Sequence, residues 1–257
     1  MSRTAEERPA EPGEAETWVK VHHHKGRRPA KKPPSPSSLI SSSVPTLRTP
    51  TLTREQVEQE HDRFAAQWRS SPSFGRLQEL FSEHAGSLGS SVTKAICFGL
   101  GTLDPSDGAW GQKRVAHTQL AAFLSIVESL QKEASQPIRC IFQEPIFNSI
   151  DKAFITSLGH QVVESPVGFE LVDSETLAFG VHLYRDIYSQ VIATHAPAIF
   201  VGTSYDVWED LYGIEKENWA PRMKEFDQLC VKAKFPENPG DTIFSSATIH
   251  WRQKDQS

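Results

Sequence analysis

Short apolar runs and longer amphipathic segments alternate along most of the chain. Each apolar run is ended by glycine, proline or polar residues, and together they predict five buried strands at 95–100, 139–143, 161–164, 176–179 and 198–201. Apolar residues at helical spacing predict helices at 114–132, 147–158, 183–193, 206–212 and 218–230. Because strands that alternate with helices favour parallel pairing and right-handed crossovers, we predict an α/β fold. It is a three-layer Rossmann-like fold, with an open, mostly parallel sheet and helices on both faces.

Further elements are predicted on either side of this alternation. Thr53 and Gln56 have the spacing of a capping box and begin an amphipathic stretch, which predicts a helix over 54–69. A second, short helix is predicted through 74–81, and both helices are expected outside the sheet. Near the other end, residues 242–251 alternate between apolar and polar, which is typical of a late antiparallel edge strand.

The first 50 residues differ from the rest in composition. They hold eight of the 17 prolines and a serine-rich stretch, but few aliphatic residues. Such a segment cannot bury enough apolar surface to offset its ordering entropy, so we expect a disordered N-terminal arm over 1–50. The remaining residues, 51–257, are enough for one domain with a sizeable core.

Charge is also divided along the chain. Residues 1–17 carry −3 and residues 18–50 carry +7, so the rest of the chain carries −9 within a total of −5. A net acidic domain argues against a nucleic-acid-binding surface on its folded part. The basic cluster at 18–32 is either a nuclear-import or partner-binding patch or simply a solvated tail.

Cysteine usage and hydropathy favour an intracellular protein. Cys97 and Cys140 lie within apolar runs, the third cysteine is Cys230, and no spacing typical of a zinc site occurs. No apolar leader and no run of 18 apolar residues is found in the sequence. We therefore expect a soluble protein of the cytoplasm or nucleus, without a metal site or a membrane span.

The carboxyl ends of the predicted strands offer a candidate binding site, because open α/β sheets bind ligands there. Gly99, Gly101 and Thr102 follow the first strand, and Glu144 follows the second. The glycines either approach a ligand or only permit a tight turn, and Glu144 either binds a ribose or caps the next helix. Position 104 is Asp104 rather than glycine, so the dinucleotide fingerprint is incomplete and a nicotinamide cofactor is disfavoured.

The later strands add three more candidates. His182 follows the fourth strand and is either a catalytic acid or base or a packed residue at a helix start. Thr203 and Ser204 follow the fifth strand and either bind a phosphate or cap the next helix. The cofactor therefore stays unknown, with S-adenosylmethionine and nucleotides as the candidates.

Several of these motifs, in this order, resemble the SRR-like family, which is named for sensitivity to red light reduced. The segments that carry the resemblance are 96–101, 119–121, 144–147, 158–159, 176–182 and 202–205. The stretch from Trp18 into the basic cluster is similar to the N-terminal region of that family, and 244–251 is similar to the ending of its fungal members. The resemblance is best over 95–205. The family's usual Pro-His-Cys is replaced here by Val181, His182 and Leu183.

The resemblance implies a regulatory protein. Its members are linked to circadian-clock and light signalling in plants, and elsewhere to haem biosynthesis and microtubule-related phenotypes, with locations in the cytoplasm and nucleus. The first hypothesis is therefore an SRR-like regulator of unknown molecular activity, with protein partners at 18–32. The alternative is an enzyme that depends on S-adenosylmethionine or a nucleotide and uses the strand-end crevice.

Overall fold

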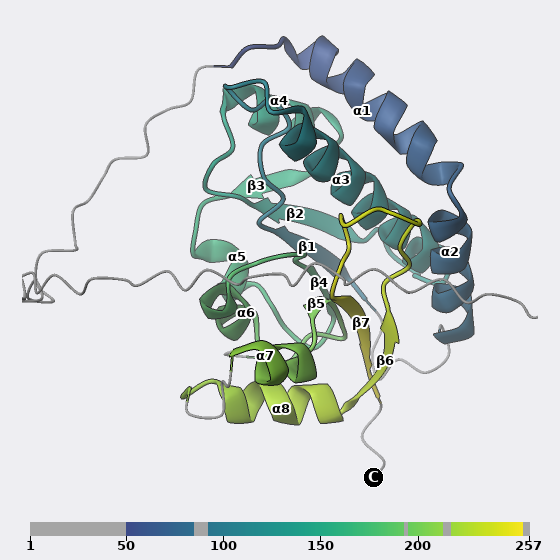
Figure 1. Cartoon of the computed structure of the whole chain (residues 1–257), viewed down its shortest axis with the longest axis vertical. Coiled ribbons are helices and arrows are strands. Elements are labelled where there is room, and N and C mark those ends of the chain that lie inside the picture. Colours follow the sequence, from purple (N-terminus) through teal and green to yellow (C-terminus); the bar gives the residue numbers. More distant parts are fainter. Residues whose placement is uncertain (1–49, 85–91, 193–194, 213–216, 254–257) are drawn as a thin grey trace, which may run out of the picture. The chain divides into compact units, whose positions relative to one another are not determined.

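A seven-stranded sheet forms the centre of the computed structural model, which describes residues 50–84, 92–192, 195–212 and 217–253 (Figure 1). The strand order is β3-β2-β1-β4-β5-β7-β6. Their bounds are β1 Lys94–Phe98, β2 Arg139–Gln143, β3 Gln161–Val163, β4 Thr176–Phe179, β5 Ile199–Thr203, β6 Cys230–Lys234 and β7 Ala247–Arg252. The first five strands are parallel, and β7 is antiparallel to both β5 and β6. The predicted α/β fold is confirmed.

The parallel strands β1, β2, β4 and β5 are largely buried because helices cover both faces of the sheet (Figure 1), whereas the edge strand β3 is only partly buried. The helices are α1 Arg54–Arg69, α2 Pro72–His84, α3 Trp110–Gln131, α4 Ser149–Ser157, α5 Val167–Glu170, α6 Arg185–Val191, α7 Tyr205–Tyr212 and α8 Ala220–Gln228. The first four lie on one face and the last four on the other. Side chains alternate accordingly, so that Cys97 belongs to the core under α1–α4 while Ile96 and Phe98 belong to the core under α5–α8.

The helix α1 begins as the sequence predicts. Thr53 accepts a hydrogen bond from the amide of Gln56, and the Gln56 side chain accepts one from the amide of Thr53 at 2.8 Å. The helix then packs on α3 and α4 rather than on the sheet itself. The predicted disordered arm lies outside the described residues, except for position 50.

Two predictions about the last strands are wrong. The late antiparallel strand exists, but it lies inside the sheet between β5 and β6 and is not an edge strand. The edge is β6, over Cys230–Lys234, where the sequence predicts the end of a helix and no strand. Its two lysines are exposed, as is common on an edge strand, and the segment therefore lacks the continuous apolar run that marks the other strands.

The strand order places the ends of β1 and β4 next to each other. From β1 the chain builds β2 and β3 on one side of the sheet, then returns to β4 and β5 on the other. The register pairs Cys97 with Phe179 and Phe98 with Gln143, so the strands end close to one level. Such a switch in strand order is where α/β folds open a binding crevice.

Candidate functional site

The part of the strand edge after β1 is covered by a leucine. Gly99 has a φ of +64° and follows β1 directly. A Cβ atom built on Gly99, or on Gly180 after β4, would collide with the side chain of Leu183. Leu183 therefore fills the space between the ends of β1 and β4, where the sequence places a ligand.

The carboxylate of Glu144 also binds groups of the protein itself. One carboxylate oxygen accepts a hydrogen bond from the amide of Gly101 at 2.8 Å, and the other accepts one from Ile146 at 2.9 Å. Glu144, for which ribose binding and helix capping were the alternatives, thus holds the loop after β1 in place. The structure therefore brings Gly99, Gly101 and Glu144 together, but Glu144 binds the loop of the protein itself.

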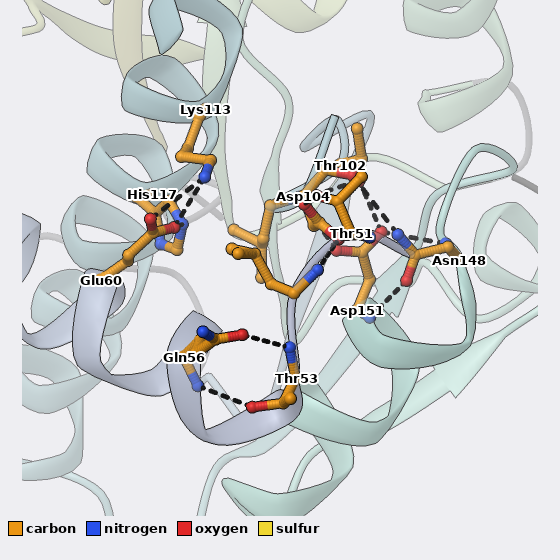
Figure 2. A network of polar contacts seen from close by, with 12 residues as sticks. Thr51, Thr53, Gln56, Glu60, Thr102, Asp104, Lys113, His117, Asn148 and Asp151 are labelled. Carbon is orange, nitrogen blue, oxygen red and sulfur yellow. Dashed lines mark hydrogen bonds and ion pairs between the residues drawn. The ribbon is translucent and has the colours of Figure 1, made fainter. Parts of the chain in front are cut away.

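Thr102 is buried in a network of carboxylates below the same loop (Figure 2). Its hydroxyl donates to Asp151 at 2.7 Å, and the amide of Leu103 donates to the other oxygen of Asp151 at 3.0 Å. Asp151 is fully buried, and this burial raises its pKa against the effect of its hydrogen bonds. The amide of Asn148 also donates to Asp151 at 2.9 Å, so the start of α4 is tied to the loop after β1.

A second carboxylate ties the start of the described chain to this loop (Figure 2). Asp104 accepts hydrogen bonds from the hydroxyl and the amide of Thr51 and, at 2.9 Å, from the amide of Leu52. Burial raises the pKa of Asp104, but these hydrogen bonds outweigh it and lower the pKa overall. The position that departs from the dinucleotide fingerprint is therefore an anchor for the segment leading into α1.

Two buried histidines lie between α1 and α3. The rings of His61 and His117 stack with centroids 5.7 Å apart, and Glu60 lies 3.9 Å from His117 and 2.9 Å from Lys113. Burial lowers the pKa of His61 to about 4 and that of His117 to about 3. Both rings are therefore neutral at pH 7 and belong to the packing of α1.

The other part of the strand edge, after β4 and β5, is hollow. A cavity of about 670 Å³ lies there and is lined by His182, Leu183, Tyr184, Arg185, Thr203, Val207, Trp208, Ser245 and Ser246. Its volume is in the range of sites for small molecules. His182 and Ser246 have φ angles of 58° and 60°, which residues other than glycine rarely adopt, and such strain is often found at functional sites.

A hydrogen bond fixes the ring of His182 at the wall of this cavity. Its Nε2 atom lies 2.9 Å from the carbonyl oxygen of Ser245. A carbonyl only accepts, so Nε2 carries the proton and, in the neutral ring, Nδ1 holds the lone pair. His182 therefore cannot take a proton from the Ser245 hydroxyl through Nε2, and the two residues do not form a nucleophile-base pair.

Thr203 lines the cavity, whereas Ser204 is largely buried and lines a second hollow beside it. The Thr203 hydroxyl is 3.2 Å from that of Tyr188, which itself donates to the carbonyl of Gly180 at 2.8 Å. Burial raises the pKa of Tyr188, so its hydroxyl stays protonated as this donor. These contacts join β5 to the end of β4.

The first amide of α7, where phosphate binding was one of the two alternatives, already has an anionic partner. The amide of Tyr205 lies 3.3 Å from a carboxylate oxygen of Asp227, which also accepts from His250 at 3.1 Å. Asp227 binds Lys232 with its other oxygen. Burial would raise the pKa of Asp227, but its hydrogen bonds and the nearby charges lower it to about 2. Asp227 is therefore an ionised carboxylate beside the first amide of α7.

The cysteines do not supply a nucleophile in the described structure. Cys97 is fully buried, and burial raises its pKa well above the ordinary value. Burial likewise raises the pKa of Cys140 to about 11 and that of Cys230 to about 12. Within the described ranges, no cluster of three or more metal-ligating side chains is found, and no helix is long and apolar enough to cross a membrane.

Sequence reasoning missed the residues that decide which part of the edge is open. Leu183 stands at the cysteine position of the family's Pro-His-Cys, whereas Arg185, Trp208 and Ser245 belong to no motif. The other signal was positional, because Leu183 and Arg185 come shortly after His182 and Trp208 comes shortly after Ser204. Ser245 is distant in sequence and joins the cavity only because β7 lies beside β5.

Comparison with known proteins identifies the family. The sequence profile of the SRR1 domain matches residues 77–251, which is most of the chain. The chain belongs to the SRR1-domain family. Comparison of this SRR1 domain with curated proteins gives no match.

Solved structures with some likeness to the SRR1 domain include two of the plantazolicin methyltransferase BpumL. The complex with SAH has a TM-score of 0.31 and 10% identity, covering 78% of this chain and 99% of that chain. The complex with a triazolic desmethylPZN analog and SAH has a TM-score of 0.33 and 9% identity, covering 78% and 91%. Scores this low support no inference about ligand or activity.

Proposed function

We propose that this SRR1-domain protein is a regulatory protein that responds to a small molecule, and that the molecule binds after β4 and β5 rather than after β1. The observation that carries the proposal is the contrast along one sheet edge. After β1, Leu183 fills the space and Glu144 and Asp151 bind the loop amides. After β4 and β5 there is a cavity of about 670 Å³.

A binding role fits the side chains of the cavity better than turnover does. Leu183 and Trp208 give it apolar walls, and Arg185 and hydroxyl groups give it a few polar ones, which is the usual character of a ligand site. Binding without chemistry is compatible with a regulator, whose output depends on whether the site is occupied. The clock, light-signalling and haem-related roles implied by the resemblance, the location in cytoplasm and nucleus, and partners at 18–32 stay predictions.

An enzyme is the second candidate, and His182 is the observation that favours it. Its Nε2 proton is held by Ser245, which leaves Nδ1 as the basic nitrogen of the neutral ring. A substrate proton within reach of Nδ1 would make His182 a general base. This hypothesis predicts that His182→Gln abolishes turnover while ligand binding persists.

Ligand binding to the full-length protein tests the proposal. S-adenosylmethionine, nucleotides, haemin and a panel of neutral and acidic metabolites are added, and the melting temperature and ligand NMR signals are recorded. Binding to the folded state alone raises stability by about 2.7 kcal/mol at a hundredfold excess over the dissociation constant.

A matched pair of variants assigns any ligand to the cavity. Val207 lines the cavity, so Val207→Trp should fill it, whereas Val167 is exposed on α5 away from it and Val167→Trp is the control. The proposal predicts that binding is lost in the first variant and kept in the second. Binding that survives Val207→Trp would contradict it.

A further inference from the structure

A second hollow adjoins the cavity on the side of β6 and β7. It has a volume of about 370 Å³, and its lining includes Ser204, Lys232, Lys234, Glu237 and Thr248. Both hollows are lined by Val207 and Ser246, so they meet at these two residues. The two hollows are therefore neighbours, and Val207 and Ser246 mark the place where a ligand longer than one hollow would pass.

The two hollows differ in chemistry. The first has the apolar walls of Leu183 and Trp208, whereas the second has hydroxyl groups, two lysines and two acids, Asp206 and Glu237. Lys232 and Lys234 are two positions apart on β6, so their side chains leave the strand on the same side. The second hollow therefore offers hydrogen-bond donors and charged groups of both signs, where the first offers mainly apolar surface.

One of the two lysines is available to a ligand. Lys232 is held by Asp227 and, at 3.3 Å, by Asp206. Lys234 is exposed and forms no ion pair with any carboxylate of the described chain. Glu237 is the remaining acid of the second hollow, and its charge opposes that of Lys234.

We infer that the two hollows form one groove for an elongated small molecule, with a planar apolar end in the first hollow and a phosphate or carboxylate beside Lys234 in the second. The inference rests on the proposed function and names the ligand class for the same site. An ammonium group attracts either anion, and the hydroxyl groups of Ser204 and Thr248 are suitable donors to both. The planar end is matched by the apolar walls beside Trp208.

Pairs of probes that differ mainly in charge test the inference on the full-length protein. AMP is compared with adenosine for the phosphate, and 2-naphthoate with 2-naphthamide for the carboxylate, by NMR titration at millimolar concentration. At least one acid should bind about three- to tenfold more tightly than its neutral partner, as expected for a partly exposed charge contact. The pair that shows the preference identifies whether the anion is a phosphate or a carboxylate.

Two substitutions with opposite expected signs assign the charge contact. Lys234→Gln should remove the preference for the acid, whereas Glu237→Gln should increase it because a repelling charge is lost. Lys132 is exposed at the end of α3, so Lys132→Gln is the matched control and should change nothing. A merely structural role of β6 would not produce these opposite effects.

Each contrary result has a separate meaning. If acid and neutral probes bind equally and Val207→Trp abolishes both, the inference is overturned and the proposed function stands. An acid preference that survives Lys234→Gln but is lost in Arg185→Gln would place the anion in the first hollow and also overturn the inference. If none of the probes binds, the inference is overturned, and the wider metabolite panel decides the proposed function independently.

Discussion

The carboxyl edge of the sheet contains two regions with opposite character. After β1 and β2, the loop amides that could bind a ligand are bound by Glu144 and Asp151, and Leu183 fills the remaining space. We call this the closed region. After β4 and β5, two residues in left-handed conformations border a cavity. We call this the open region. The comparison teaches that a strand-end motif gives a location, while side chains from distant loops decide whether the location can bind anything.

The largest expected effect comes from the closed region. Asp151→Ala removes the acceptor for Thr102, Leu103 and Asn148, all of them buried or nearly so. Because donors are left unpaired in the interior, the free energy of unfolding should fall by about 3 to 5 kcal/mol in urea denaturation. Asp210 is exposed on α7, so Asp210→Ala is the control and should cost less than about 0.5 kcal/mol. A loss below about 1 kcal/mol for Asp151→Ala would mean that the closed region is not held by this network.

Mild acid should weaken the packing of α1 above the closed region. Each histidine has a pKa near 6.5 in the unfolded chain, but about 4 for His61 and about 3 for His117 in the folded protein. The unfolded state therefore binds more protons between these values, and the stabilising effect of the neutral rings is lost as the pH falls below 6.5. From pH 7 to pH 5 the free energy of unfolding should drop by about 2 kcal/mol for each histidine.

A variant separates this effect from that of the carboxylates. His117→Phe keeps an aromatic ring next to Phe64 but cannot take up a proton. Between pH 7 and pH 5 the free energy of unfolding in urea should then drop by about 2 kcal/mol less than in the unaltered protein. An unchanged pH dependence would show that His117 is not buried in the neutral form.

Leu183 should mark the boundary between the two regions. Leu183→Ala removes the side chain that covers Gly99 and Gly180, and the cost in unfolding free energy should be about 2 kcal/mol because Leu183 is only partly buried. The variant should also bind apolar probes that shift the amide NMR signals of Gly99 and Gly180. If the space stays closed to such probes, Leu183 is not what separates the regions.

The smallest expected effect lies in the open region. Ser246 has a φ of 60°, and Ser246→Gly should relieve the strain and raise the free energy of unfolding by about 0.5 to 1 kcal/mol. Ser70, at the end of α1, has an ordinary helical conformation, so Ser70→Gly serves as the control and should be neutral or destabilising. Destabilisation by Ser246→Gly would show that the side chain contributes more than the strain costs.

The sequence predicted β1, β2, β4 and β5 well because a strand buried on both faces needs a continuous apolar run, and it also predicted the partly exposed edge strand β3 from a shorter apolar run. The sequence did not predict β6, because its lysines alternate with small or apolar residues at the exposed edge of the sheet. The ends of β1 and β5 could be named as candidate positions from their glycine and hydroxyl residues. The packing of Leu183 over Gly99 and the contact of Asp227 with α7 could not be predicted, because each depends on how a distant segment packs.

An amide NMR titration of the full-length protein with the ligand that stabilises it most shows directly whether the ligand binds in the open region. Signals of the open region, such as those of Thr203, Ser246 and Val207, should shift in proportion to occupancy, while those of Gly101 and Leu103 should not. Val207→Trp should abolish the shifts. Shifts centred on Gly101 and Leu103, with Thr203 and Val207 unchanged, would contradict the account and place the site in the closed region after β1.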